Sequence, residues 1–410
     1  MYGLIGEKLS HSYSKGIHEQ LADYTYNLIE LNNEELDVFL KEKKFKACNV
    51  TIPYKQTVIP YLDAIDEHAS KIGAVNTIVN ANGYVKGYNT DYYGFWYMLQ
   101  YYGIEIKQRK VVVLGVGGAS KAVAAVLRDL EASEVVFVHP KGKEGITYEQ
   151  CYTQHNDAQV LVNTSPVGMY PNVDQTPIDL HKFTQLESVV DIVYNPIKTK
   201  LIVEAEMLQL KTAGGLMMLV AQAKQAVEIF TGKKLDDTCI EQITNQLMLQ
   251  KRNIVLIGMP SCGKTSIAKE LSKQLGYPFM DIDEEIVKQQ GCSIPDIFQQ
   301  YGENYFRDLE TKVTKEVSQL TGVIISCGGG VIKRLENMVA LKQNGYIVYI
   351  QRDIEKLIAD TTRPLSSSKE AILRLYEERY ALYEAYSECK IANNDTIEKA
   401  VEELIHLFKG

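Results

Sequence analysis

The chain has 410 residues, of which 45% are hydrophobic and 23% charged, values typical of two or three globular domains. Its net charge of −8 argues against a general nucleic-acid-binding protein, because such proteins carry a basic surface. The seven cysteines are scattered without a CxxC pair, and no apolar run approaches the roughly 18 residues of a membrane span. We therefore expect a cytoplasmic protein with reduced thiols that acts on small molecules, with neither nucleic acid nor membrane as a partner.

The first 95 residues mix short apolar runs with helical patterns, which predicts a small α/β domain. Strands are expected at 2–6, 47–52 and 74–79, and helices at 14–24, 33–43 and 56–71. Polar residues gather near the predicted strand ends: Ser12, Ser14, Thr51, Lys55, Asn76 and Asp91. Taken singly, each of them is an ordinary cap, turn or surface residue.

A second α/β unit begins at Lys110, where the run VVVLG is followed by the helical pattern GVGGASKAVAAVLRDL. Gly115 and Gly117 permit a tight turn and a close approach of the backbone to a pyrophosphate. The next predicted strand, 135–138, is followed by Lys141 and Lys143 and by no acidic residue at its end. This favours NADP over NAD, because the 2′-phosphate of NADP is negatively charged. The alternative is that both lysines are solvated loop residues. Further strands are expected at 161–165 and 189–194, and a helix closed by glycine at 218–232.

The pattern breaks near 245–252, where we expect a junction, and the strand NIVLIG then opens a third unit. Residues 258–265 match GxxxxGK[ST] between an apolar strand and a helix. In this motif the backbone N–H groups cradle phosphates, Lys264 reaches the β- and γ-phosphates, and Thr265 binds Mg²⁺. An ordinary glycine turn would not explain the Lys264–Thr265 pair.

Acidic, glycine and arginine residues follow in the third unit, with the arginines at 307, 363 and 379. Asp281 and Asp283 are two residues apart at a predicted strand end, so we expect both on one face, where they could hold Mg²⁺ and accept a hydroxyl proton. The alternative is a solvated strand end. Three glycines, 328–330, follow an apolar strand and allow a close approach to a ligand.

In order and spacing, residues from about 252 to 408 resemble shikimate kinases. The resemblance implies a P-loop α/β domain similar to nucleoside-monophosphate kinases, with a parallel sheet, that uses ATP and Mg²⁺ to phosphorylate the 3-hydroxyl of shikimate. It implies a carboxylate clamp of Arg307 and Arg379, with Asp283 orienting the hydroxyls and Gly328, Gly329 and Gly330 lining the pocket. On the ATP side it implies Gly258, Gly263, Lys264, Thr265, Ser266 and Arg363, with Thr265 and Asp281 serving the metal. The stretch between Arg363 and Arg379 is short for the lid of this family.

Residues 1–245 resemble shikimate dehydrogenases, through the residues above and through the runs 163–169, 191–196 and 218–222. The resemblance implies a substrate-binding domain over 1–95, onto which a helix near 225–245 packs back, and a Rossmann NADP-binding domain over 96–224, with the kinase domain at 250–410. Ser12, Ser14 and Tyr194 would bind the substrate carboxylate, and Thr51, Asn76 and Gln222 the ring hydroxyls. Lys55 and Asp91 would form the catalytic pair. The implied NADP-binding residues are Gly115, Gly117, Gly118, Ala119, Lys141, Lys143, Gly215 and Met218.

Together the resemblances predict a bifunctional enzyme that reduces 3-dehydroshikimate with NADPH and phosphorylates the resulting shikimate. In one alternative, the first part oxidises quinate and the kinase acts on a related hydroxy acid, since a small carboxylate with hydroxyls satisfies the same residues. In another, the chain is a metabolite sensor derived from these enzymes. The presence of the groups needed only for turnover disfavours the sensor.

Overall fold

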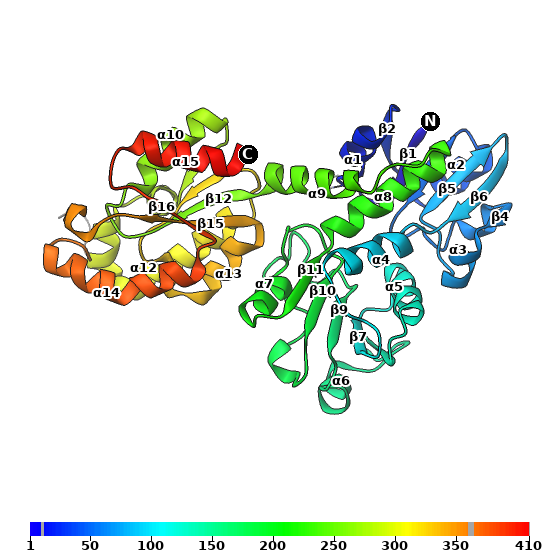
Figure 1. The fold of residues 1–410 in the computed structure, drawn as a ribbon, viewed down its shortest axis with the longest axis horizontal. Coiled ribbons are helices and arrows are strands. Elements are labelled where there is room, and N and C mark those ends of the chain that lie inside the picture. Colours follow the sequence, from blue (N-terminus) through cyan, green and yellow to red (C-terminus); the bar gives the residue numbers. More distant parts are fainter. Residues whose placement is uncertain (10–11, 360–364, 410) are drawn as a thin grey trace. The chain divides into compact units, whose positions relative to one another are not determined.

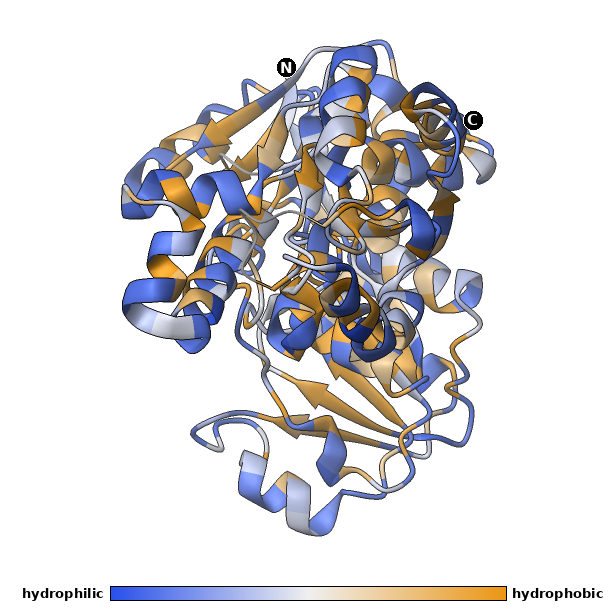
Figure 2. Cartoon of the chain, turned by 90° about the vertical axis from the view of Figure 1, so that its left-hand side faces the viewer, coloured by the Kyte–Doolittle hydropathy of each residue, from blue (hydrophilic) through white to orange (hydrophobic). Residues whose placement is uncertain are grey.

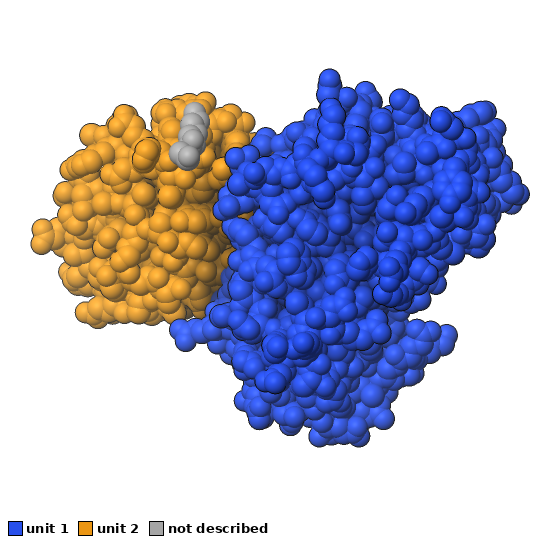
Figure 3. All heavy atoms as spheres, turned by 45° about the vertical axis from the view of Figure 1, so that its right-hand side comes forward, with its two compact units in different colours: residues 1–195, 204–246 blue, residues 196–203, 247–410 orange. Residues whose placement is uncertain are grey.

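The computed structural model describes residues 1–9, 12–359 and 365–409, so the expected ATP-binding residue Arg363 lies outside the described residues. The chain divides into two compact units, one of residues 1–195 and 204–246 and the other of 196–203 and 247–410 (Figure 3). The described residues form three β-sheets, two in the first unit and one in the second (Figure 1). Their strands are among the most hydrophobic segments of the chain (Figure 2).

The first sheet has six strands in the order β2-β1-β3-β5-β6-β4. They are β1 (Tyr2–Gly6), β2 (Tyr26–Glu30), β3 (Ala47–Val50), β4 (Ala64–Ile65), β5 (Thr77–Ala81) and β6 (Tyr84–Tyr88). β1 pairs in parallel with β2 and β3, whereas β5 is antiparallel to β3 and β6. The helices of this region are α1 (Ser14–Leu21), α2 (Asn33–Glu42) and α3 (Glu67–Ile72).

The helix expected over 56–71 is wrong for most of its length. The segment contains turns, the short 3₁₀ helix η1 (Ile59–Tyr61) and β4, and only α3 is α-helical. Pro60 lies in the first turn of η1, where its missing N–H is tolerated, and cannot continue a helix from 56. The side chain of Asp66 accepts a hydrogen bond from the His68 N–H and so begins α3. The strand expected at 74–79 begins at Thr77.

Both faces of the first sheet are covered, because neighbouring residues of a strand point to opposite sides. Ile5 packs in a cluster with Leu36 of α2. Leu4 packs with Ala226 and Phe230 of α8 (Leu216–Thr231), a helix that lies more than 200 residues later in the sequence of the first unit. α8 ends before Gly232, whose φ of 70° suits glycine, and the helix expected near 225–245 is two helices, α8 and α9 (Thr238–Lys251).

The second sheet is parallel, with the strand order β11-β10-β9-β7-β8. Its strands are β7 (Lys110–Leu114), β8 (Glu134–Val138), β9 (Val160–Asn163), β10 (Ser188–Asp191) and β11 (Lys211–Gly214). The helices are α4 (Asp91–Tyr101), α5 (Gly118–Asp129), α6 (Tyr148–Gln154) and α7 (Lys200–Met207). α4 packs against α5 and α8 and so links the two sheets. A Cβ on Gly94 of α4 would lie 2.6 Å from the Met218 carbonyl oxygen, so glycine permits this close contact.

The third sheet is also parallel, in the order β13-β14-β12-β15-β16. Its strands are β12 (Asn253–Ile257), β13 (Phe279–Asp281), β14 (Ile324–Ser326), β15 (Gly345–Gln351) and β16 (Cys389–Ala392). Its helices are α10 (Lys264–Leu275), α11 (Ile282–Gln290), α12 (Ile294–Ser318), α13 (Leu335–Asn344), α14 (Lys369–Tyr386) and α15 (Ile397–Lys409). The expected α/β fold class, with a Rossmann-type domain and a P-loop domain, is confirmed.

The junction expected at 245–252 agrees with the boundary between the two compact units, which lies between Gln246 and Leu247. The helical pattern does not break there, however, because α9 runs through the segment and ends just before β12. Ile240, Ile243 and Leu247 are buried at helical spacing, so the amphipathic pattern continues through the segment. Across the described parts of the chain, we find no helix with the length and apolar character that a membrane crossing needs.

Candidate active sites

One edge of the first sheet collects the polar residues expected to bind substrate. β1 and β3 are parallel and end there, β5 begins there, and β6 ends there. Thr51 follows β3 and Asn76 precedes β5, while Asp91 begins α4 just after β6. Ser14 begins α1, which follows β1. The sheet therefore gathers residues that are far apart in the sequence.

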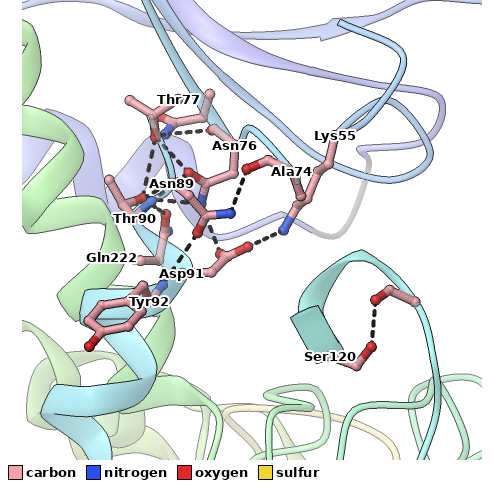
Figure 4. Close-up of polar contacts among 12 residues, drawn as sticks. Lys55, Ala74, Asn76, Thr77, Asn89, Thr90, Asp91, Tyr92, Ser120 and Gln222 are labelled. Atoms are coloured by element: carbon pink, nitrogen blue, oxygen red, sulfur yellow. Dashed lines mark hydrogen bonds and ion pairs between the residues drawn. The ribbon is translucent and has the colours of Figure 1, made fainter. Parts of the chain in front are cut away.

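Lys55 and Asp91 form a partly buried ion pair within this edge (Figure 4). Nζ of Lys55 lies 2.6 Å from Oδ2 of Asp91, and the two side chains are 16% and 9% exposed. The other carboxylate oxygen, Oδ1, accepts a hydrogen bond from Nδ2 of Asn76 at 2.9 Å. Asp91 thus accepts from one charged and one neutral donor, and the ammonium group retains some access to solvent.

Gln222 joins the same network from α8. The Thr90 hydroxyl donates to Oε1 of Gln222 at 3.2 Å, and the backbone N–H of Thr90 donates to Oδ1 of Asn76 at 2.8 Å. The approach of Gln222 to Thr90 depends on Gly94, since a Cβ on Gly94 would lie 2.9 Å from the Gln222 Cβ. One N–H of Gln222 is held by the Leu219 carbonyl at 2.9 Å.

Tyr194, which follows β10, lies against the serine segment. Its ring centroid is 5.4 Å from that of Tyr13, the residue between Ser12 and Ser14. The Ser14 N–H donates to the Ser12 hydroxyl at 3.2 Å. Burial, with a smaller effect of Tyr13, raises the pKa of Tyr194 to about 12, so its phenol is a neutral hydrogen-bond donor near neutral pH. The structure therefore brings Tyr194 to the expected carboxylate-binding serines.

The glycine turn after β7 leads directly into the N-terminus of α5. Gly115 has a φ of 105°, and a Cβ there would lie 3.0 Å from Oγ1 of Thr164, so only glycine fits. No atom lies within 4 Å of a Cβ placed on Gly117, and on Gly118 the nearest is Cδ of Lys55 at 3.7 Å. The backbone N–H groups at the start of this 12-residue helix are therefore approachable, next to the Lys55–Asp91 pair. The expected cofactor residue Ala119 lies in the first turn of α5.

Two further expected cofactor residues lie where α8 begins. Gly215 precedes the helix, and a Cβ there would collide with the Ile192 carbonyl group just after β10. Met218 is buried in the first turn of α8.

Lys141 and Lys143 are exposed in the loop between β8 and α6. A cavity of about 390 Å³ lies beside α5 and β8, and the two lysines do not line it. Its lining includes two cationic residues, Lys121 and Arg128, and the acidic Glu144, none of which the sequence pattern gave a reason to select.

In the second unit, the P-loop connects β12 to α10. Gly258 and Gly263 have φ values of 149° and 99°, and a Cβ on Gly258 would lie 2.5 Å from the Ile350 carbonyl oxygen. Lys264 is buried, and its Nζ donates to the carbonyl groups of Gly258 and Met259, both at 2.9 Å. The ammonium group therefore lies at the loop itself. Ser266 is the third residue of α10.

Oxygen atoms cluster beside the P-loop. The Thr265 hydroxyl donates to Oδ2 of Asp281 at 2.9 Å and lies 3.2 Å from the hydroxyl of Ser326, the last residue of β14. Carboxylate and hydroxyl oxygens are suitable ligands for Mg²⁺. Ser326 was not expected from the sequence, although its position at the end of a strand next to β12 is a usable signal.

The expectation that Asp281 and Asp283 share one face of a strand is wrong. β13 ends at Asp281, and Asp283 lies in the first turn of α11. Oδ1 of Asp281 accepts from the N–H groups of Asp283 and Glu284 at 3.0 and 3.2 Å, which caps the helix and turns the chain.

The expected substrate-lining glycines 328–330 lie against the three charged side chains also expected to bind the kinase substrate. A Cβ on Gly328 would lie 2.8 Å from Oδ1 of Asp283, and one on Gly330 would collide with the Arg307 guanidinium group. Arg379 of α14 is buried and donates to the Gly329 carbonyl group at 3.0 Å. The backbone at residue 329 also packs against Pro260 of the P-loop, so the two loops are adjacent.

Glu310 is a buried residue of this site that the sequence pattern did not reveal. Its Oε2 accepts from Arg307 at 2.7 Å, and among the described residues its Oε1 has no hydrogen-bond partner. Burial raises the pKa of Glu310 above its usual value, although the Arg307 guanidinium opposes the shift. Arg307 also pairs with Glu303 at 3.1 Å, so two carboxylates hold it.

Known proteins resemble both parts of the chain. Residues 4–78 match the family model of the shikimate dehydrogenase substrate binding domain, and residues 260–409 match that of shikimate kinase. The shikimate dehydrogenase (NADP(+)) of Clostridium beijerinckii is 42% identical over 254 residues, which cover 58% of this chain and 93% of that protein.

Solved structures give the same result. A chorismate mutase/shikimate 5-dehydrogenase fusion protein from Clostridium acetobutylicum is 37% identical with a TM-score of 0.57, over 60% of this chain and 96% of that one. A quinate dehydrogenase from Corynebacterium glutamicum in complex with NAD is 29% identical with a TM-score of 0.54, over 60% and 98% of the two chains. The expected resemblances are thus confirmed: the chain belongs to the shikimate dehydrogenase family and carries a shikimate kinase domain at its C-terminal end.

Proposed function

We propose that the chain catalyses two consecutive reactions, the NADPH-dependent reduction of 3-dehydroshikimate to shikimate and the ATP-dependent phosphorylation of shikimate at its 3-hydroxyl. The observation that carries the first activity is the Lys55–Asp91 contact at 2.6 Å beside the glycine turn of α5. The second is supported by the convergence of Asp283, Arg307 and Arg379 on one glycine turn next to the P-loop. The product of the first reaction is the substrate of the second.

In the dehydrogenase, Lys55 and Asp91 act as the acid–base pair. NADPH, when bound, supplies a hydride to the carbonyl carbon of the substrate. The carbonyl oxygen then takes a proton from Nζ of Lys55 as the carbon–oxygen double bond becomes a single bond. Asp91 keeps the lysine in place and compensates its charge, and the ammonium group stabilises the negative charge that develops on oxygen.

The remaining polar residues of the sheet edge orient the substrate. The hydroxyls of Ser12 and Ser14 and the neutral phenol of Tyr194 donate to its carboxylate, which the proximity of Tyr13 and Tyr194 supports. Thr51, Asn76 and Gln222 bind the ring hydroxyls. Asn76 and Gln222 are already joined through Thr90, so their amide groups are preorganised.

The glycine turn suits a dinucleotide, because Gly117 and Gly118 leave the start of α5 approachable for a pyrophosphate. Gly115 and Ala119 belong to the same turn. Gly215 and Met218 contribute where α8 begins, and Lys141 and Lys143 supply the positive charge that favours the 2′-phosphate of NADP.

In the kinase, the two arginines 307 and 379 bind the shikimate carboxylate, and Asp283 accepts the proton of the 3-hydroxyl. ATP with Mg²⁺ supplies the phosphoryl group, and the backbone from Gly258 to Thr265 is shaped to hold phosphates. Lys264 compensates charge on the transferred group. Thr265 and Asp281 would hold the metal ion, as their contact at 2.9 Å supports. Arg363 is proposed for the phosphates from the sequence alone.

A quinate dehydrogenase activity is the second candidate, because the quinate dehydrogenase from Corynebacterium glutamicum covers the same part of the chain. Comparing kcat/KM for shikimate and quinate, each with NADP and NAD, separates the two. We expect shikimate with NADP to be the preferred pair, since Lys141 and Lys143 favour a 2′-phosphate. We further propose that the enzyme acts in the cytoplasm, which the seven free cysteines support.

The test uses the purified full-length chain with 3-dehydroshikimate and NADPH, with and without ATP and Mg²⁺. NADPH loss is followed by absorbance and the products by mass spectrometry. We expect shikimate without ATP and shikimate 3-phosphate with it. Absence of NADPH loss would refute the dehydrogenase assignment, and accumulation of shikimate in the presence of ATP would refute the kinase assignment.

A further inference from the structure

A buried chain of hydrogen bonds lies behind the acid–base pair of the dehydrogenase. The Tyr26 hydroxyl donates to Oδ1 of Asn49 at 2.7 Å, and Nδ2 of Asn49 donates to Oγ1 of Thr77 at 3.0 Å. Oγ1 of Thr77 donates to Oδ1 of Asn76 at 3.0 Å, and Nδ2 of Asn76 donates to Oδ1 of Asp91 at 2.9 Å. All five residues are buried, and Figure 4 shows the end of the chain nearest Asp91.

Two backbone groups fix the direction of this chain. The Thr90 N–H, which can only donate, points at Oδ1 of Asn76 at 2.8 Å. The carbonyl oxygen of Asn76, which can only accept, lies 3.3 Å from Nδ2 of Asn49. Each amide therefore has one orientation that satisfies its neighbours. The Thr77 hydroxyl donates to Oδ1 of Asn76 at 3.0 Å, which is nearer than its other neighbour, the Thr90 hydroxyl at 3.3 Å. The Tyr26 hydroxyl must donate to Oδ1 of Asn49, because an amide oxygen only accepts.

The end of this hydrogen-bond chain that is farthest from Asp91, at Tyr26, is kept uncharged by its packing. The ring of His18 stacks on that of Tyr26 with centroids 4.0 Å apart. Burial lowers the pKa of His18 to about 3, so its ring is uncharged at neutral pH. Burial also raises the pKa of Tyr26 well above its usual value, so the phenol remains a donor.

We propose that Tyr26, Asn49 and Thr77 are positioning residues of the dehydrogenase, which turn the Asn76 amide so that its N–H faces Asp91. The Asp91 carboxylate is thereby oriented, with its other oxygen toward Lys55. The proposal rests on the acid–base role assigned above to the Lys55–Asp91 pair. Tyr26, Asn49 and Thr77 act on the substrate indirectly, through Asn76 and Asp91. Aliphatic side chains could fill the same positions in the core of a sheet, so packing alone does not require polar residues there.

The polar chain makes a specific demand on Thr77, whose hydroxyl both donates and accepts. Valine has nearly the same shape and offers neither function, so Thr77→Val removes one donor from Asn76 and leaves one N–H of Asn49 without its acceptor. A net hydrogen bond corresponds to roughly a fivefold to tenfold change in rate. Thr77→Ser keeps the hydroxyl and is the matched control.

The experiment measures kcat and both KM values of full-length wild type, Thr77→Val and Thr77→Ser with 3-dehydroshikimate and NADPH. We expect roughly a fivefold to tenfold lower kcat for the valine variant, an unchanged KM for NADPH, and recovery of most of the rate by serine. With NADPH deuterated at the transferred position, the isotope effect on kcat should rise for valine only, because the chemical step becomes slower.

Kinase turnover of the same preparations controls for the amount of intact chain. Tyr26→Phe, which removes the donor at the far end and keeps the ring stack, is the second variant should the valine variant misfold; we expect a smaller decrease in kcat. Equal kcat for valine and serine variants, or Tyr26→Phe at the wild-type rate, would overturn the positioning role. Wild type without NADPH turnover would instead refute the proposed dehydrogenase function.

Discussion

In the proposed dehydrogenase site, both carboxylate oxygen atoms of Asp91 must accept hydrogen bonds. Oδ2 accepts from Nζ of Lys55 at 2.6 Å and Oδ1 from Nδ2 of Asn76 at 2.9 Å. In Asp91→Asn one of these positions becomes an NH₂ group, so a donor faces a donor whichever way the amide turns. A positioned proton donor contributes roughly a hundredfold to ten-thousandfold to a rate, and we expect Asp91→Asn and Lys55→Met each to lose that much in kcat.

Because the two residues work as a unit, the double variant should be about as slow as the slower single variant. The assay follows NADPH absorbance under saturating 3-dehydroshikimate, and kinase turnover of each preparation serves as the control. The reasoning would be refuted if Asp91→Asn kept more than about a tenth of the wild-type kcat, given the contribution expected of such a group. Losses that multiply in the double variant would equally contradict a paired role.

Two other predictions concern cofactor choice and stability. The double variant Lys141→Ala with Lys143→Ala should raise the KM for NADPH and leave the KM for NADH unchanged. The control is Lys107→Ala, which replaces an exposed lysine paired with Glu131 and should change neither KM. An unchanged KM for NADPH in the double variant would contradict the proposed role of Lys141 and Lys143 at the 2′-phosphate. Burial raises the folded-state pKa of Glu310, so its contribution to stability is present below its ordinary value of 4.5 and is lost as the pH rises above it. Glu310→Gln should therefore flatten the fall in the urea midpoint of unfolding, followed by the loss of kinase turnover, as the pH rises above 4.5. An unchanged slope would contradict this.

The sequence predicts those parts of the fold that depend on local signals. The β-branched run 110–114 followed by a glycine turn, and the P-loop before α10, carry their own geometric requirements and lie where expected. Local signals also explain the errors. Pro60 and Asp66 divide the segment 56–71, and Asp281, whose side chain caps α11, ends β13 two residues before Asp283.

Contacts between distant residues are harder to predict. Glu310 lies three residues after Arg307 on α12, so the ion pair itself is local, but the burial of Glu310 depends on how α12 packs against distant segments. Asn49 and Thr77 read as ordinary strand residues, since nothing in their neighbourhood along the chain indicates that they pair across β3 and β5. Such contacts follow only from the register of the sheet.

The most direct test of two separate active sites in one chain uses Lys55→Ala and Lys264→Ala, alone and mixed, with 3-dehydroshikimate, NADPH, ATP and Mg²⁺. Lys55→Ala should leave 3-dehydroshikimate unreduced and still phosphorylate added shikimate, whereas Lys264→Ala should consume NADPH and stop at shikimate. The mixture should form shikimate 3-phosphate. Loss of both activities in either single variant, or failure of the mixture to form shikimate 3-phosphate, would contradict the account.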